Sequence, residues 1–170
     1  MAHSDPLCDL AHGLGDPPDQ DRTLVAVFDS PVAGQLLHLG RHLGFRTILV
    51  DPEPVAEPPP VDQVARSLAA DFVDGTTDIV VTDHDRPELG ALLRDALALP
   101  ARWIGLMGSP RHTPPHVAAL RGLGASEADI SRVHRPIGLN IGSHTPPEIA
   151  VATLAGLLAD RNGRPGGFAF

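Results

Sequence analysis

Residues 23–50 read TLVAVFDSPVAGQLLHLGRHLGFRTILV, and this stretch decides the fold class. It opens with the apolar run 23–28, which is typical of a central parallel strand because both faces of such a strand are covered. Leucines and a valine then recur at helical spacing and predict a helix that buries them on one face. Strand character returns at 46–50, so the stretch predicts a strand–helix–strand crossover. The four residues expected on the inner helix face are Val32, Leu36, Leu39 and Leu43.

The same alternation continues to the end of the chain. The last helix has the clearest boundaries, because Thr145 and Glu148 match a capping box and Asn162 with Gly163 closes the helix. Five prolines in residues 52–60 predict an irregular surface connection. Further strands are expected at 78–82 and 102–106, and further helices at 87–99, 114–123 and 126–134, whereas 61–73 fits a short edge strand followed by a helical turn only ambiguously.

This order of elements predicts an α/β fold. We expect a Rossmann-like open parallel sheet with helices on both faces, forming a single domain over residues 23–165. Residues 1–22 carry five aspartates and no sustained period, so a flexible acidic tail is expected there. In such a sheet the ligand crevice lies at the carboxyl ends of the strands, and the loops that follow the strands are therefore the candidate binding segments.

Composition excludes several function classes. The chain has 170 residues and a formal net charge of −8, with no basic block, so nucleic-acid binding is not expected. All 13 basic residues are arginine, which excludes Schiff-base and Walker-lysine chemistry. Cys8 is the only cysteine, and no apolar run is long enough to span a bilayer. These features and the acidic amino terminus predict a cytoplasmic protein that is not membrane-bound.

The first crevice loop lacks the glycines that a dinucleotide site needs. Asp29 and Pro31 stand where the first two glycines of the fingerprint would be, so a negative charge faces the phosphate position and an amide donor is missing. NAD(P) binding is therefore not expected. Asp51 follows the second strand, where an acidic residue would meet ribose hydroxyls, although an Asp-Pro turn explains it equally well.

Two later loops carry the candidate anion-binding groups. Gly108, Ser109 and Arg111 would let a ligand approach the backbone and would offer a hydroxyl and a guanidinium, unless Ser109 only caps the next helix. His84 and Asp85 follow the neighbouring strand and fit either anion binding and proton transfer or a helix cap.

Metal binding and serine catalysis have little support. His112 and His116 are four residues apart, but two prolines lie between them and no carboxylate completes a triad, so no metal site is expected. No G-x-S-x-G elbow is present, and no catalytic residue is assigned.

The segments WIGLMGSPR, from Trp103, and PIGLNIGSHTPPEIAVATLAGLLA, from Pro136 to Ala159, resemble the carboxy-terminal Rossmann-like domain of the XdhC/CoxI family. VFDSPVAGQLLHLGRHLGFRTILVDPEP resembles the first βαβ unit of that family, and IVVTDHD resembles its strand that ends in Thr-His-Asp. The likeness covers about residues 23–162. Members of the family are accessory proteins of xanthine dehydrogenase, carbon monoxide dehydrogenase and related molybdenum hydroxylases.

The resemblance implies a non-catalytic accessory factor that binds the molybdenum cofactor (molybdopterin) during sulfuration and insertion into an apo-hydroxylase. A cysteine desulfurase, a separate subunit in place of the family's amino-terminal domain, and a second copy of the chain are the further partners expected. A pterin with a phosphate would suit a glycine-opened loop facing a capped helix amino terminus. The predicted cofactor-binding residues are Gly108, Ser109, Arg111, His84, Asp85, Gly138, Asn140, Gly142, Thr145, Glu148 and Asp51.

Three departures from the family pattern keep alternatives open. The Gly-x-Gly of the first loop is replaced, Gly156 stands where the family usually has Glu, and only some 22 residues precede the first strand. The alternatives are an NAD(P)-dependent oxidoreductase, favoured by fold analogy alone, and a degenerate interaction module that has lost its ligand.

Overall fold

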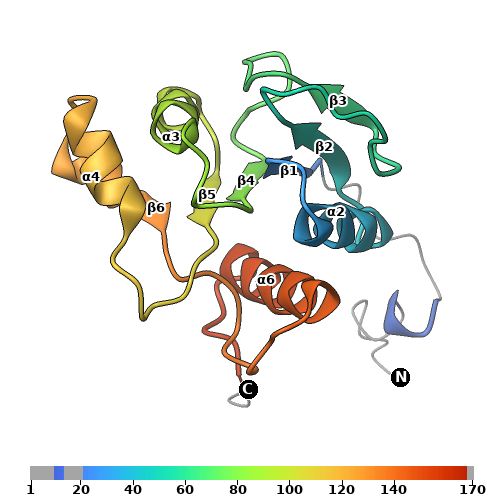
Figure 1. The fold of residues 1–170 in the computed structure, drawn as a ribbon. Coiled ribbons are helices and arrows are strands. Elements are labelled where there is room, and N and C mark those ends of the chain that lie inside the picture. The colour runs from blue at the N-terminus through green and yellow to red at the C-terminus, as the bar shows by residue number, and fades with distance from the viewer. Residues whose placement is uncertain (1–9, 14–20, 168–170) are drawn as a thin grey trace.

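The computed structural model describes residues 10–13 and 21–167 (Figure 1). Most of the tail expected at 1–22 therefore lies outside the described residues. The strands are β1 (Thr23–Val27), β2 (Arg46–Val50), β3 (Gln63–Ala65), β4 (Thr77–Val81), β5 (Trp103–Leu106) and β6 (Val133–His134). The helices are α2 (Pro31–His42), α3 (Leu89–Ala98), α4 (Pro115–Gly122), α5 (Glu127–Ile130) and α6 (Pro146–Arg161).

The strands form one parallel sheet in the order β3-β2-β1-β4-β5-β6. The strand order reverses between β1 and β4, which are paired in register from Thr23 with Thr77 to Val27 with Val81. This is the strand order of dinucleotide-binding domains, whose crevice opens at the reversal point. The prediction of a Rossmann-like parallel sheet is confirmed.

Two layers of helices cover the sheet (Figure 1). Helices α2 and α6 lie side by side on one face, over Leu24 and Ala26 of β1. Helices α3, α4 and α5 lie on the other face, over Val25 and Val27. Every residue of β1 is buried, because successive side chains point into opposite layers. Among the described residues, no helix is both long and apolar enough to cross a membrane.

Helix α2 forms where it was predicted, and three of its four predicted inner residues, Leu36, Val32 and Leu39, are in or packed against the core. Its buried residues are Ala33, Leu36, Leu37 and Gly40, and Leu43 is 41% exposed. The expectation that Leu43 lies on the inner face is therefore wrong. The small residues Ala33 and Gly40 are buried against the sheet instead. A Cβ at Gly40 would lie 2.5 Å from Leu24 Cδ2, so the helix packs tightly on β1.

The helix predicted at 126–134 is wrong in its second half. Only the single turn α5 forms, and Val133 with His134 pairs with β5 as the last strand of the sheet. His134 also stacks on Trp103, with ring centroids 5.3 Å apart. In the segment 61–73, whose sequence is ambiguous, the edge strand β3 forms and a single helical turn follows it, closed by the hydrogen bond from the Val73 amide to the Ala69 carbonyl oxygen at 3.1 Å. Strand β6 depends on pairing with β5, which local sequence does not encode.

Candidate functional site: a pocket at the carboxyl ends of β4, β5 and β6

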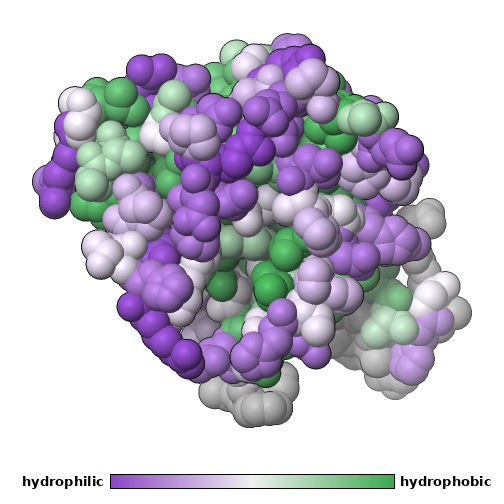
Figure 2. All heavy atoms as spheres, in the orientation of Figure 1, coloured by the Kyte–Doolittle hydropathy of each residue, from purple (hydrophilic) through white to green (hydrophobic). Residues whose placement is uncertain are grey.

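A pocket of about 750 Å³ opens where three parallel strands end. Its walls are the loops after β4, β5 and β6, together with the first turns of α2 and α6. Figure 2 shows the molecule hollowed on this face, with apolar residues in the hollow and hydrophilic ones around it. The volume lies in the range of small-ligand sites in proteins.

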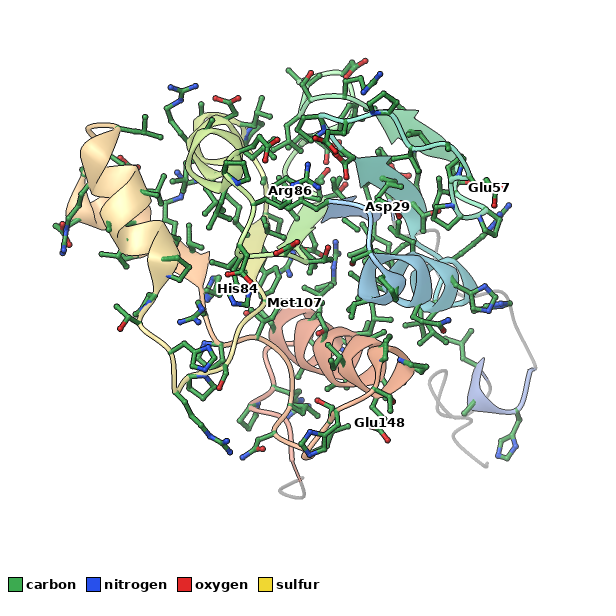
Figure 3. All side chains as sticks on the ribbon, in the orientation of Figure 1. Asp29, Glu57, His84, Arg86, Met107 and Glu148 are labelled. Atoms are coloured by element: carbon green, nitrogen blue, oxygen red, sulfur yellow. The ribbon has the colours of Figure 1, made fainter. Side chains whose placement is uncertain are left out.

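Among the residues that the structure describes, the lining of the pocket contains no carboxylate. The whole chain has 21 acidic and 13 basic residues, yet the charged or ionisable groups that line the pocket are Arg111, His84 and His144. Figure 3 shows His84 close to Met107 at the ends of neighbouring strands. A lining of arginine, histidine, hydroxyl and backbone groups favours an anionic ligand.

The loop after β5 presents Ser109 and Arg111 at the exposed rim. The Ser109 hydroxyl accepts a hydrogen bond from the Arg111 amide at 3.2 Å, and the next helix begins only at Pro115. The alternative in which Ser109 caps that helix is therefore wrong. No hydrogen bond or ion pair from the Arg111 guanidinium occurs within the described residues, so this cation is available to a ligand.

Arg135, which the sequence did not point to, holds this loop in place. Its guanidinium donates to the carbonyl oxygens of Ser109 (3.0 Å) and His112 (3.3 Å). It packs so closely that a Cβ at Gly108 would lie 2.7 Å from Arg135 Nε. Arg135 directly follows β6, at the end of the sheet where binding loops lie. Its role could not be predicted because the sequence did not predict this strand.

The loop after β6 forms the other wall, and it lies against helix α6. Gly138 and Gly142 have φ of +84° and +70°, so this loop makes two backbone turns that glycine permits. The Leu139 amide donates to the carbonyl oxygen of Ala152 at 2.9 Å. Asn140 lines the pocket between the two glycines.

Glu148 and Thr145 lie at the amino terminus of α6 and do not line the pocket. Glu148 Oε2 accepts hydrogen bonds from the amides of His144 (2.9 Å) and Thr145 (3.1 Å). These bonds favour the charged form and hold the pKa of the Glu148 carboxyl below its usual value. The carboxylate therefore serves the helix cap and orients the His144 backbone at the pocket edge.

Of the predicted pair His84 and Asp85, only His84 lines the pocket. His84 lines the pocket, whereas the Asp85 side chain is 87% exposed and lies 3.7 Å from His84 Nε2. Asp83 accepts from the Asp85 amide at 2.9 Å, and α3 begins at Leu89 without a side-chain cap. The helix-cap alternative for these aspartates is therefore wrong. Thr82, which the sequence analysis did not select, lines the pocket beside His84.

Asp51 lies apart from the pocket, buried at 3% exposure beyond β2. Its two carboxylate oxygens accept hydrogen bonds from the amides of Asp29 (2.8 Å) and Glu53 (2.9 Å). The hydrogen bond from the Glu53 amide closes the turn that was expected at Asp51 and Pro52. Arg86 Nη2 lies 3.5 Å from the Asp51 carboxylate.

The structure thus brings most of the predicted site together. The predicted residues that line the pocket are His84, Gly108, Ser109, Arg111, Gly138, Asn140 and Gly142. Asp51, Asp85, Thr145 and Glu148 lie outside the lining, and a contact between them and a cofactor stays a prediction. In residues 10–13 and 21–167, no group of three or more His, Cys, Asp or Glu is placed to hold a metal ion.

His116 and His112 occupy different environments in the structure. His116 is buried, at 5% exposure, whereas His112 is exposed. Burial, and then the nearby charge of Arg135, lower the pKa of His116 below its usual value, so the ring is neutral at pH 7.

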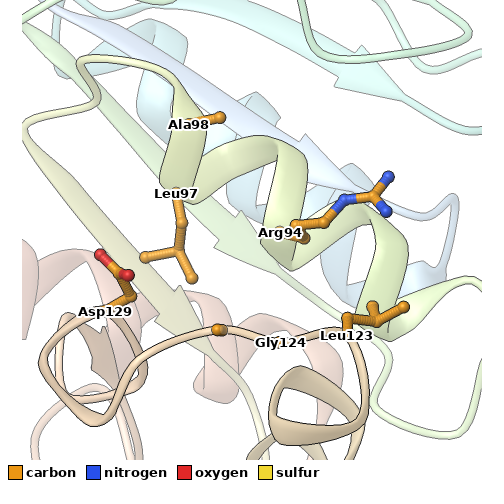
Figure 4. A pocket seen from close by; sticks show the side chains of 7 residues that line it. Arg94, Leu97, Ala98, Leu123, Gly124 and Asp129 are labelled. Atoms are coloured by element: carbon orange, nitrogen blue, oxygen red, sulfur yellow. The ribbon is translucent and has the colours of Figure 1, made fainter.

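A second, smaller cavity of about 230 Å³ lies between α3 and the turn after α4 (Figure 4). Leu97 and Leu123 line this cavity together with Arg94 and Asp129. It is remote from the strand carboxyl ends and carries none of the predicted site residues.

Comparison with known proteins decides the family. The sequence profile of the XdhC Rossmann domain matches residues 24–157, most of the chain. The chain belongs to the XdhC Rossmann domain family. Its loops after β4, β5 and β6 carry the motifs on which the resemblance was based.

Two further proteins are similar to this XdhC-type chain. "Uncharacterized protein YqeB" of Escherichia coli (strain K12) is 39% identical over 89 residues, which are 52% of this chain and 16% of that protein. A crystal structure described as a xanthine dehydrogenase from Bacillus halodurans has a TM-score of 0.67 at 22% identity, covering 88% of this chain and 45% of that chain. The structural likeness shows the shared fold. The chain spans less than half the length of either protein.

Proposed function

We propose that this XdhC-type domain binds the molybdenum cofactor and serves the maturation of a molybdenum hydroxylase of the xanthine dehydrogenase kind. Family membership supports the general role, as does the likeness to a protein described as a xanthine dehydrogenase. The observation that carries the proposal is the 750 Å³ pocket. The chain is acidic, yet the described residues that line this pocket include arginine, histidine and glycine and no carboxylate.

The residues of the pocket fit a phosphate-bearing pterin. Arg111 and the Ser109 hydroxyl would hold the anionic group at the rim, and His84 would face it from the neighbouring strand. Met107, which is buried, and Ile149 give the heterocycle an apolar surface. The bound cofactor would supply its hydroxylation chemistry only in the client enzyme. This chain's own residues bind it, orient it and shield it from water.

A titration tests the proposal. Purified protein is titrated anaerobically with molybdenum cofactor, and binding is followed by calorimetry. The Arg111→Ala variant should bind about tenfold more weakly, because a charge-assisted hydrogen bond contributes about 1.5 kcal/mol or more. Arg94→Ala removes an exposed arginine of α3 outside the pocket and should bind like the wild type. Folded wild-type protein that binds no cofactor would refute the proposal.

The accessory partners remain part of the proposal. Delivery to an apo-hydroxylase, help from a cysteine desulfurase and association with a separate subunit or a second copy follow from the family likeness. Affinity purification of the chain, with and without added cofactor, tests them directly. A molybdenum hydroxylase subunit should be recovered, and Arg111→Ala should recover less of it if transfer depends on the loaded pocket.

A further inference from the structure

One half of the crevice is filled by the protein itself. In this fold a dinucleotide lies across the crevice, with one half over β1 and β2 and the other over the strands beyond the reversal point. Over β1 and β2, both oxygens of Asp51 are engaged by backbone amides. Because Asp51 is also buried, its remaining lone pairs are not presented to ribose hydroxyls.

The amino terminus of α2 is equally occupied. The Ser30 hydroxyl accepts from the Ala33 amide at 3.0 Å and donates to the Thr82 hydroxyl at 3.1 Å. Pro31 has no amide to offer, and the Asp29 amide is bonded to Asp51. A phosphate at this helix would meet few free donors and would face the exposed Asp29 carboxylate.

Arg86 packs over Phe28 in this half of the crevice, among three carboxylates. Its guanidinium lies 4.8 Å from the centre of the Phe28 ring and within 4 Å of the carboxylates of Asp51, Glu53 and Glu88. Figure 3 shows Arg86 and Asp29 on the β1 side of the crevice, away from Met107. Phe28 has φ of +73° at the end of β1, where the fold otherwise favours glycine. Arg86, Asp51 and Asp29 are all outside the pocket lining.

We infer that the pocket selects a pterin that carries one phosphate and discriminates against the same pterin extended through a pyrophosphate to a second nucleotide. This inference rests on the proposed function. The open half holds the pterin and its single phosphate, near Ser109 and Arg111. An added nucleotide would be directed toward Asp29 and Pro31, where the backbone gives no cradle and the charge is repulsive.

The test compares two forms of one cofactor. Wild-type protein is titrated anaerobically with metal-free molybdopterin and with molybdopterin cytosine dinucleotide, and both dissociation constants are measured by calorimetry. The single-phosphate form should bind at least about tenfold more tightly, because one unpaired like-charge contact is enough for such a factor. Equal or tighter binding of the dinucleotide form overturns the inference and leaves the proposed function standing. Binding of neither form overturns both.

A variant that restores the glycines tests the cause. In Asp29→Gly/Pro31→Gly the charge is removed and the backbone is opened, so the two constants should approach each other while the constant for the single-phosphate form stays unchanged. Glu57→Gln, an exposed carboxylate in the 52–60 connection, is the matched control and should keep the wild-type ratio. An unchanged ratio in a folded double variant contradicts the assigned cause. If circular dichroism shows the double variant unfolded, the wild-type comparison decides alone.

Discussion

Two glycines determine how closely the loop after β6 lies on helix α6. A Cβ at Gly138 would lie 2.9 Å from the backbone carbon of Ala152, and a Cβ at Gly156 would lie 2.9 Å from Gly138 Cα. Neither position has room for a side chain, because the neighbouring atoms belong to backbone. Gly156, one of the departures from the family pattern, therefore has a physical reason here, since a glutamate would have to displace the pocket wall.

Gly138 and Gly142 differ in the space around the Cβ position, so they separate the steric cost of a side chain from its conformational cost. Gly138 and Gly142 both have positive φ, but only Gly138 has backbone within 4 Å of a Cβ position. Gly142→Ala should lower the free energy of unfolding by about 1 kcal/mol, the cost of a left-handed alanine. Gly138→Ala should lower it by roughly 2–4 kcal/mol, because overpacking adds to the strain.

Urea unfolding, followed by the fluorescence of the single tryptophan, Trp103, measures both variants. Equal losses for Gly138→Ala and Gly142→Ala would show that the loop can move away from the helix, contrary to the packing described.

At the scale of elements, α6 depends on its first turn. Its apolar residues are spread around the helix, because α2, the sheet and the loop after β6 all pack against it. The exposed turn at Thr145 and Glu148 has no such support, so the cap carries the local stability.

The cap predicts a pH dependence. The pKa of Glu148 is lowered because its carboxylate accepts two backbone amides. Its contribution to stability is therefore full above the usual glutamate value of 4.5 and is lost as the pH falls through the lowered pKa. Glu148→Gln should be less stable than the wild type at pH 7, and the difference should shrink at pH 3. Thermal unfolding by circular dichroism at both values measures it, and a constant difference would contradict the assignment.

Prediction of elements succeeded where a pattern is long and failed where it is short. Helix α6 carries its own capping box and β1 its own apolar run, so local sequence was enough for both. The two residues of β6 carry no pattern, and only pairing of Val133 with Ile104 makes them a strand. The same missing strand concealed Arg135, which follows it directly.

At the scale of the whole molecule, one buried carboxylate joins the sheet to α6. Asp78, at the start of β4, is fully buried and is bonded by Arg102 Nε at 2.5 Å and Arg161 Nε at 2.6 Å. Arg161 also donates to the carbonyl oxygen of Thr76. This cluster lies at the amino ends of the strands, opposite the pocket, so it fixes α6 without contacting a ligand.

Removing this carboxylate should affect stability and leave binding alone. Asp78→Ala should lower the free energy of unfolding by about 3–5 kcal/mol, because two partly buried guanidinium groups lose their partner. Asp78→Asn, which keeps an acceptor, should lose less. Glu127→Ala breaks the exposed pair with Arg121 and should show no comparable change. Denaturant unfolding gives the losses, and a weakened cofactor affinity in folded Asp78→Asn would contradict the separation of the two ends.

The strand–helix–strand unit at 23–50, the glycine positions and the cap of α6 were determined by sequence alone, because each depends on neighbours within a few residues. Only the tertiary structure decided which distant charges meet. Asp51 meets Asp29 and Arg86, and Arg135 reaches the loop of Ser109, through contacts that join separate strands. Such contacts depend on strand order and register, which a single sequence does not reveal, and they divide the crevice into a closed half and an open pocket.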